Sequence, residues 1–495
     1  PTRLYFAANR LFRSDDRGDS WQAVSPNLTQ QIDRNQLEVM GTVWSAESVW
    51  KNVWTSFYGN IVSLDESPLQ EGLLYVGTDD GLIQVTEDGG RHWRKTALFP
   101  GIPENTYVAD LKASVHDANT VFAVFNNHKR GDFKAYVLKS VDRGLTWTSI
   151  SSNLPARHVA WCIQQDPVRR DLLFVGTEFG LFFSLDGGSH WIHLKGGAPT
   201  VAFRDLEIQA RECDLVCATF GRGIMILDDY SPLRQATPAL MQAPALLFPV
   251  KRSWIYAQDA PMGGGGKASL GDGFFVAPNP PFGAVFTYHL KEGLQSWRQS
   301  RKQQERKREK AGQPVPYPEW DALRQEDAED NPMVFLTVSD DRAQVVRRVK
   351  GPAGAGMHRV AWDLRYARRT PVTQGNGDDP WQDSGSGVAA LPGQYTVQLS
   401  QYVDGEFSVL TEAQPFELVP LDRQSLPVDR KAKFAFETGV SQLQHAVASL
   451  DRSLDDALNR VTAAKQTLYA SPQKSEALIT RARAIERDLT RLAVD

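Results

Sequence analysis

Charged side chains cluster in the short turns between apolar stretches of the first 235 residues. Carboxylates in such turns could form the acid and the nucleophile or base of a glycoside hydrolase, which needs one such pair. The basic run "NNHKRGD" from Asn126 could instead hold an anionic or polar ligand. The candidate ligand-binding residues are Asp79, Asp80, His128, Lys129, Arg130, Asp132, His158, Glu178, Arg204, Asp205 and Arg222.

Several of these residues also have a structural alternative. Asp79 and Asp80 occupy positions at which β-turns favour aspartate. Ion pairs within or between repeats would engage four more candidates, namely Glu178 with Arg222 and Arg204 with Asp205. Because the sequence gives no separation between carboxylates, it assigns no catalytic residue.

The composition argues against several kinds of function. The net charge of −4 leaves no overall basic character of the kind that nucleic-acid binding favours. No run of about 18 apolar residues occurs, so we predict no transmembrane segment. Cys213 and Cys217 have no second Cys or His pair nearby, which is a poor arrangement for zinc. We expect neither a metal nor a cofactor.

The turns belong to an internal repeat. Four segments align without gaps: "SDDRGDSW" from Ser14, "TEDGGRHW" from Thr86, "SVDRGLTW" from Ser140 and "SLDGGSHW" from Ser184. Their fixed acids and tryptophans are Asp16, Trp21, Asp88, Trp93, Asp142, Trp147, Asp186 and Trp191. A β-rich stretch precedes each segment, and a fifth copy from Leu215 keeps the strands without the motif. Repeats of about 40 to 50 residues with several strands are typical of β-propeller blades.

The repeated motif has a mechanical explanation. Its Asp and its Ser or Thr can bond to the backbone of a tight turn, its Gly can adopt a positive φ, and its Trp can close the turn against the strands. We therefore interpret it as the lock of a β-hairpin. If the motif joins the third and fourth strands of each blade, the candidate ligand-binding residues lie at the opposite end, on loops of the kind that commonly carry function.

The motif resembles the Asp box, or bacterial neuraminidase repeat, of sialidases, xyloglucan-type glycosidases and the sortilin-like luminal receptor domain. Residues 1–235 are more closely similar to large bacterial exported proteins labelled sortilin-like or Asp-box glycosyl hydrolase. The motifs "NNHKRGDF", "VGTEFGLFF" and "TFGRGIMILDDYSPL" carry this match, and "GMHRVAWDLRY" extends it. The cysteine-rich module of sortilin and the sialidase set of three arginines, a Tyr–Glu pair and an acid Asp are not found. The resemblance implies a secreted, periplasmic or cell-surface protein.

Five repeats are fewer than most closed propellers contain. The chain also opens without Met, inside a repeat. We therefore expect the C-terminal part of a longer protein, whose ring is completed by missing upstream blades or by another chain.

The remaining sequence predicts two further domains. Residues 240–425 contain short runs with partial alternation, separated by Gly and Pro, which suit an immunoglobulin- or fibronectin-like β-sandwich. Within them, the charged segment 291–330 predicts a solvated helical insertion. In 427–495, apolar residues recur every three or four positions and predict an α-helical hairpin. The expected fold is mainly β: Asp-box β-propeller blades, then the sandwich, then the C-terminal hairpin.

Binding is the function that these features favour. We expect an exported binding or scaffold protein that recognises a peptide or a glycan on the propeller face opposite the Asp boxes. One alternative is a glycoside hydrolase that uses a carboxylate pair. The other is a structural subunit of a larger extracellular assembly.

Overall fold

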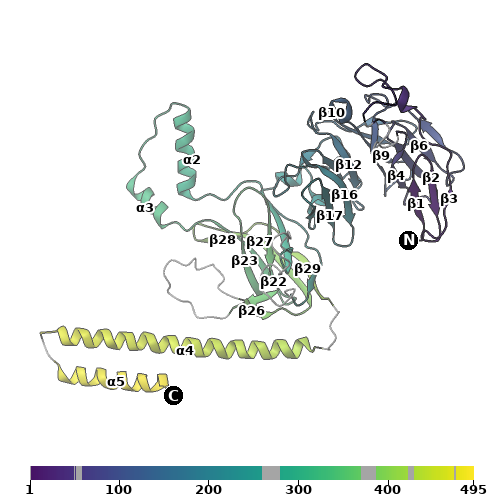
Figure 1. Ribbon diagram of the computed structural model, residues 1–495. Coiled ribbons are helices and arrows are strands. Elements are labelled where there is room, and N and C mark those ends of the chain that lie inside the picture. Colours follow the sequence, from purple (N-terminus) through teal and green to yellow (C-terminus); the bar gives the residue numbers. More distant parts are fainter. Residues whose placement is uncertain are drawn as a thin grey trace. The chain divides into compact units, whose positions relative to one another are not determined.

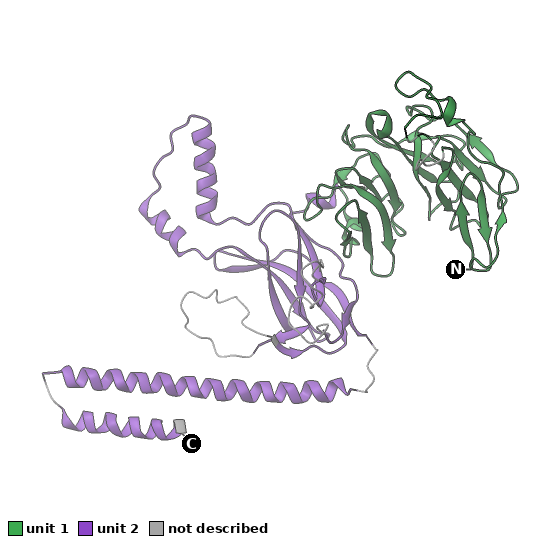
Figure 2. Ribbon diagram, viewed as in Figure 1, with its two compact units in different colours: residues 1–237 green, residues 238–495 purple. Residues whose placement is uncertain are grey.

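The computed structural model describes residues 2–49, 51, 58–258, 279–368, 386–421, 428–472 and 475–494. The chain divides into two compact units, unit 1 at residues 1–237 and unit 2 at 238–495 (Figure 2). Strands dominate unit 1, and two long helices end unit 2 (Figure 1). The mainly β fold class expected from the sequence is confirmed.

The described residues of unit 1 form five small antiparallel sheets, which we call blades A to E. Within each blade, strands that follow one another in sequence are neighbours in the sheet, as in up-and-down propeller blades. Blade A is β1 (Leu4–Ala7), β2 (Leu11–Ser14) and β3 (Gln22–Ala23). Blade B is β4 (Ile61–Glu66), β5 (Leu74–Thr78), β6 (Ile83–Thr86) and β7 (Arg94–Thr96). Blade C is β8 (Tyr107–Ala113), β9 (Val121–Asn127), β10 (Asp132–Ser140) and β11 (Thr148–Ser149).

Blades D and E and three short helical turns make up the rest of the described part of unit 1. Blade D is β12 (Ala160–Gln165), β13 (Leu173–Thr177), β14 (Gly180–Ser184) and β15 (Ile192–His193). Blade E is β16 (Phe203–Gln209), β17 (Asp214–Thr219) and β18 (Ile224–Leu227). The helical turns are η1 (Arg34–Gln36), η2 (His128–Arg130) and α1 (Pro232–Gln235).

Apolar layers hold successive blades together. Between blades B and C, for example, Tyr75 and Val85 pack in one buried cluster with Val108 and Phe125. Similar clusters join A to B, C to D and D to E. Every residue of β5, β9 and β13 is buried, because the second strand of a central blade is covered on both faces. This double burial explains the continuous apolar runs in the sequence.

Each Asp box closes its hairpin with the same side-chain hydrogen bonds. In blade C the Ser140 hydroxyl donates to the Asp142 carboxylate (2.7 Å) and accepts from the Gly144 backbone N–H (2.8 Å). The same carboxylate accepts the backbone N–H of Thr146 (2.8 Å). Gly144 has a φ of 76°, which glycine adopts without strain. Equivalent bonds occur in blades A, B and D.

The box tryptophans of blades B, C and D also contact the preceding blade. The Trp93 indole N–H lies 3.4 Å from the Val24 carbonyl, which follows blade A. The Trp191 indole donates to the Ile150 carbonyl, at the end of blade C (2.7 Å). Trp147 is buried in the layer between blades B and C. The box therefore joins neighbouring blades, a role that the sequence interpretation as a hairpin lock did not include.

Unit 2 is built around a β-sandwich. One sheet has the order β19 (Ala245–Leu247), β21 (Ala284–Leu290) and β24 (Gly356–Trp362). The other has the order β20 (Ser253–Ile255), β29 (Gln414–Pro420), β27 (Gly393–Val403), β22 (Met333–Ser339) and β23 (Val345–Gly351), with β28 (Glu406–Val409) also paired to β27. Phe286, Trp362, Leu336 and Phe416 share the core between the two sheets. A small hairpin, β25 (Arg365–Ala367) and β26 (Ser386–Ala389), and a helical turn, η3 (Leu240–Gln242), complete the β-rich part.

The long helices in the described part of unit 2 form two separate pairs. The insertion holds α2 (Trp297–Lys310) and α3 (Trp320–Ala328), where the Arg301 guanidinium donates to Glu326 (2.6 Å). The C-terminal pair is α4 (Arg430–Ala470) and α5 (Glu476–Val494), which lie side by side (Figure 1). No helix in the described part of the chain combines the length and apolar character of a membrane span.

Candidate functional site

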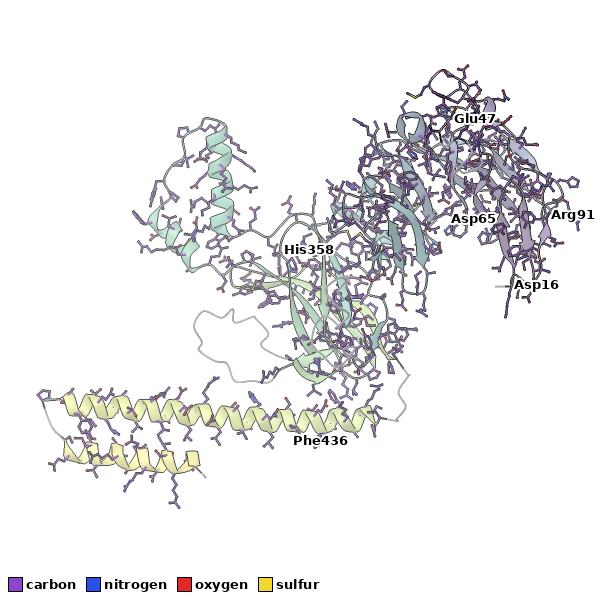
Figure 3. The ribbon with its side chains drawn as sticks, in the orientation of Figure 1. Asp16, Glu47, Asp65, Arg91, His358 and Phe436 are labelled. Atoms are coloured by element: carbon purple, nitrogen blue, oxygen red, sulfur yellow. The ribbon has the colours of Figure 1, made fainter. Side chains whose placement is uncertain are left out.

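The two ends of a blade carry different loops. In blades B, C and D the Asp-box hairpin joins the third and fourth strands at one end. The turn between the second and third strands, and the connection to the next blade, lie at the other end. Asp16 of the first box and Glu47 of the β3–β4 connection accordingly lie at opposite ends of unit 1 (Figure 3). We call the end opposite the boxes the loop face.

A β-bulge recurs at one position of the innermost strand in four blades. The pairing shifts between Ala160 and Cys162 in β12, and shifts also occur in β4, β8 and β16. The extra residues are Val62, Ala109, Trp161 and Arg204. A β-bulge changes the direction in which a side chain points. The same irregularity of the backbone therefore presents a different residue in each blade.

Trp161 and Arg204 come together from adjacent blades. The Arg204 guanidinium carbon lies 3.4 Å from the centre of the Trp161 ring. The Trp161 indole N–H donates to the Glu178 carboxylate (2.9 Å), and the His128 ring lies 5.2 Å from the Trp161 ring. A planar guanidinium stacks favourably on an aromatic face. The Trp161 ring thus contacts a cation, the Arg204 guanidinium, on its face and an anion, the Glu178 carboxylate, at its N–H.

This arrangement forms part of a pocket of about 290 Å³ on the loop face, which we call the aromatic pocket. Phe133 and Phe179 add exposed rings, and Arg157 adds a second guanidinium. The full lining is His128, Phe133, Arg157, Val159, Trp161, Glu178, Phe179 and Arg204. Blades C, D and E and their connections therefore all contribute to the aromatic pocket.

A second pocket, of about 400 Å³, is lined mainly by polar residues, and we call it the polar pocket. Its lining is Tyr58, Asn60, Val62, Asp79, Asn105, Tyr107, Asn126, Asn127, Lys129 and Arg130. Lys129 lies 5.6 Å above the Tyr107 ring. Since His128 lines one pocket and Lys129 the other, the turn η2 borders both.

Six of the eleven predicted residues line these pockets. His128, Glu178 and Arg204 line the aromatic pocket, and Asp79, Lys129 and Arg130 line the polar pocket. Neither ion pair considered from the sequence forms among the described residues. Glu178 accepts from Trp161 instead of pairing with Arg222, and Arg204 stacks on that ring instead of pairing with Asp205.

The other five predicted residues do not line either pocket. Asp80 is fully buried and accepts from the Thr78 hydroxyl, and burial raises its pKa. The Asp132 carboxylate accepts from the Tyr136 hydroxyl (2.7 Å). The remaining three are His158, packed edge-on against two Phe rings; Asp205, exposed on β16; and Arg222, exposed in the β17–β18 turn.

The sequence prediction missed three aromatic residues of the site: Trp161, Phe133 and Phe179. The repeat contained one signal for Trp161. It occupies the bulge position at which blades B and C have Val62 and Ala109, so a large ring replaces a small side chain there. Phe133 and Phe179 lie within the motifs "NNHKRGDF" and "VGTEFGLFF", but nothing in these motifs singled out their rings as part of a site.

Carboxylates of the innermost strands connect neighbouring blades. Asp65 of β4 accepts the backbone N–H of Ala113 in β8 (2.7 Å), and Asp110 of β8 accepts that of Ile163 in β12 (2.9 Å). Burial raises the pKa of Asp110 to about 7. Because each of these two carboxylates accepts a hydrogen bond from the next blade, we assign Asp65 and Asp110 a structural role. Among the described residues, His, Cys, Asp and Glu side chains form no group that could hold a metal ion.

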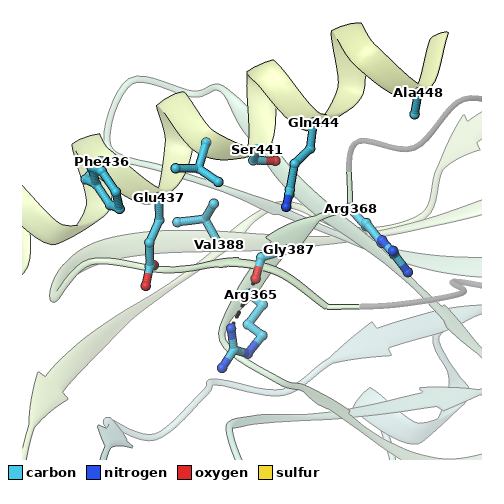
Figure 4. Close-up of a pocket in the computed structure, with 10 residues that line it drawn as sticks. Arg365, Arg368, Gly387, Val388, Phe436, Glu437, Ser441, Gln444 and Ala448 are labelled. Atoms are coloured by element: carbon cyan, nitrogen blue, oxygen red, sulfur yellow. Dashed lines mark hydrogen bonds between the residues drawn. The ribbon is translucent and has the colours of Figure 1, made fainter. Parts of the chain in front are cut away.

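Unit 2 contains a larger cavity, of about 510 Å³, between α4 and the β25–β26 hairpin (Figure 4). Phe436, Glu437 and Gln444 of α4 border it on one side. On the other side Arg365 donates to the Gly387 carbonyl (3.1 Å). This cavity is open to solvent and lies where one helix rests on one hairpin, so we interpret it as a packing gap. The converging loops of unit 1 make the aromatic pocket the better candidate for a ligand site.

The fold defines a β-propeller protein. By sequence, neither a family of known proteins nor a curated protein matches the chain. Similar solved structures include an ancestral GH74 enzyme (16% identity, TM-score 0.33), which aligns with 44% of this chain and 26% of its own.

Two other similar structures align with different shares of this chain and of their own length. YCF48 bound to a D1 peptide has 16% identity and a TM-score of 0.28, over 34% of this chain and 51% of its own. A GH74 enzyme of Niastella koreensis has 14% identity and a TM-score of 0.33, over 82% of this chain and 55% of its own. This chain thus spans between about a quarter and about half of the three proteins. No function follows from likenesses at this level.

Proposed function

We propose that the chain is a binding protein that recognises a peptide or a glycan on the loop face of its propeller blades. The observation that carries the proposal is the stack of Arg204 on Trp161, with Glu178 bonded to the indole. It forms a preorganised charged and aromatic surface at the wall of the aromatic pocket. In this proposal the protein is exported, in line with the resemblance of its repeats to those of exported bacterial proteins.

The lining of the aromatic pocket favours a peptide over a glycan. Phe133 and Phe179 offer exposed apolar rings, while Arg157 and Arg204 offer guanidinium groups suited to a carboxylate. Trp161 is not an open platform for a flat sugar ring, because Arg204 already stacks on it. We therefore favour a peptide that combines an apolar side chain with an acidic group.

Hydrolysis of a glycoside is the alternative activity, and the pocket geometry favours it less. The reaction needs two carboxylates that flank the bond to be broken. Among the described residues that line the aromatic pocket, Glu178 is the one carboxylate. Asp79 lines the polar pocket, but its carboxylate accepts the backbone N–H groups of Gly59 and Asn60 (3.0 and 2.8 Å).

Arrays of peptides and of glycans, probed with the wild-type protein and with Arg204→Ala, test the proposal. We expect a ligand for the wild type and a loss of affinity of about tenfold in the variant, the effect of roughly 1.4 kcal/mol. Arg222→Ala is the matched control, since Arg222 is exposed outside both pockets. Release of reducing sugar by the wild type, abolished in Glu178→Gln, would establish the hydrolase alternative instead.

A further inference from the structure

The two pockets of the loop face carry more positive than negative charge. Their linings hold four cations and two carboxylates: Arg157, Arg204, Lys129, Arg130, Glu178 and Asp79. Both carboxylates already accept hydrogen bonds, from the Trp161 indole and from two backbone N–H groups respectively. Among the described residues, none of the four cations forms an ion pair. The positive charge of the pockets is therefore available to a ligand.

Arginines at the Asp-box end of the blades are paired instead. The Arg143 guanidinium lies 2.5 Å from the Glu87 carboxylate. The Arg170 guanidinium lies 3.1 Å from the carboxylate of Asp117, in the β8–β9 connection. The loop face thus differs from the opposite end by cations that gather at two pockets without a protein carboxylate, which is the arrangement that binds anionic groups.

The polar pocket also contains amide groups that are held in place. Asn126 is only 3% exposed, and its side-chain oxygen lies 2.8 Å from Nδ1 of the His128 ring. The side-chain oxygen of Asn105 accepts an N–H from the β3–β4 connection (2.7 Å). Neither amide nitrogen has a hydrogen-bond partner among the described residues, and both residues line the pocket. With the two cations of this pocket, these donors favour a carboxylate as the ligand group.

The two pockets adjoin each other at His128. Burial is the largest cause of the lowered pKa of His128, and the charges of Lys129 and Arg204 lower it further. One of these cations lines the polar pocket and the other lines the aromatic pocket. Because charges act strongly only over short distances, a cation of each pocket lies near this ring. A single ligand can therefore reach both pockets across the turn η2.

We propose that one peptide occupies both pockets, and that the polar pocket binds a second carboxylate of that peptide. This inference rests on the proposed function, in which the aromatic pocket holds an apolar side chain and a first acidic group. The second carboxylate pairs with Lys129 and Arg130 and accepts the amide N–H of Asn126. It belongs either to an acidic side chain or to the C-terminus of the peptide. The loop face thus selects a peptide with two separated negative charges.

The fold limits the spacing between the two charges. Blades B and C provide strand residues of the polar pocket, and blades C, D and E provide those of the aromatic pocket. Packed sheets are about 10 Å apart, so one to two blade spacings correspond to roughly 10–20 Å. An extended chain advances about 3.3 Å per residue, so about two to five residues separate the two acidic residues of the peptide.

Short synthetic peptides test this proposal on the full chain. The probes are acetylated and amidated Phe-Asp-(Gly)n-Asp, with n from zero to eight, and the same series with Asn in place of the second Asp. For the wild type we expect the second Asp to raise the affinity about tenfold, with a maximum at n of about two to five. Peptides Phe-Asp-(Gly)n with a free C-terminus show whether a terminal carboxylate gives the same gain. Isothermal titration calorimetry measures the affinities.

Two double variants locate the second carboxylate. Lys129→Ala/Arg130→Ala should abolish the gain, so that the two series bind equally, and its unfolding temperature shows whether it is folded. The matched control is Arg91→Ala/Lys95→Ala, which removes two exposed cations near the Asp-box hairpin of blade B (Figure 3 labels Arg91) and should keep the gain.

Three results would overturn the proposal. A gain of equal size at every n, or one lost equally in both double variants, would mean that overall charge explains it. Binding of the singly acidic series without any gain from a second carboxylate would overturn the role of the polar pocket and leave the proposed function standing. If neither series binds, the proposed function fails as well.

Discussion

Arg204 and Trp161 occupy the same bulge position in adjacent blades, and the guanidinium of one stacks 3.4 Å from the ring centre of the other. The bulge belongs to the repeat, since it also occurs in β4 and β8. The Arg204 and Trp161 side chains do not belong to the repeat, because Val62 and Ala109 occupy the same position in blades B and C. The candidate site therefore lies where the repeated β-bulge carries side chains that differ from those in the other blades.

A double-mutant cycle on this pair tests its part in binding. For a ligand selected from the arrays, we expect Arg204→Ala and Trp161→Ala each to weaken binding. Their coupling energy should be about 0.5–2 kcal/mol, the range of a cation–π contact. Isothermal titration calorimetry measures the four affinities. Trp161→Phe keeps a ring for Arg204 and should retain most of the affinity. Strictly additive effects of the two alanine substitutions would show that the stack does not contribute to binding.

Ligand affinity should depend on pH through His128. Burial, followed by the nearby charges of Lys129 and Arg204, lowers the pKa of His128 below its ordinary 6.5. The His128 ring is therefore neutral at pH 7. Its titration should leave the ligand affinity unchanged from about pH 8 down to about pH 6.5. At lower pH, protonation adds a positive charge and should strengthen binding of an anionic ligand.

His128→Gln provides the control for this pH dependence, because glutamine does not titrate. We expect the increase in affinity at low pH to be absent in the variant. An increase already complete above pH 6.5 in the wild type would contradict the lowered pKa.

The Asp boxes should stabilise the fold in a pH-dependent way. Hydrogen bonds from Ser20 and Ser14 lower the pKa of Asp16 from 3.8 to about 2. A carboxylate whose pKa falls on folding contributes stability that is fully present above pH 3.8 and is lost as the pH falls through about 2. The difference in unfolding temperature between wild type and Asp16→Asn should thus be constant near neutral pH and disappear near pH 2. A difference equally large at pH 2 and pH 7 would contradict this account.

Two box tryptophans should differ in their effect on stability. Trp191 is buried between blades C and D, so Trp191→Ala should reduce the free energy of unfolding by about 3–5 kcal/mol. Trp21 is 45% exposed, so Trp21→Ala in the same chain should cost less than about 1 kcal/mol. Urea unfolding measures both values. Equal losses would mean that the box tryptophans act within their own hairpins and do not seal neighbouring blades.

The sequence predicted the elements well because their signals are local. The spacing of Ser140, Asp142 and Gly144 is sufficient to form the box hydrogen bonds, whatever surrounds the hairpin. The apolar periodicity of residues 440–461 likewise indicated α4. The order of strands in a blade then placed the candidate loops at one end.

The site was predicted only in part, because its geometry depends on contacts between blades. The sequence alone does not reveal that a bulge turns Trp161 toward the loop face. Nor does it distinguish Asp79, which lines a pocket, from Asp80, which is buried behind it. Residue type and loop position are the same for these two aspartates, and only the packing separates them.

Hydrogen–deuterium exchange with and without the array-selected ligand tests the central claim most directly, because it locates the bound ligand along the chain. We predict protection in residues 126–133, 157–161, 178–179 and 203–205, with the Asp boxes unchanged. Protection confined to the Asp-box hairpins or to unit 2, with these four segments unchanged, would contradict the account.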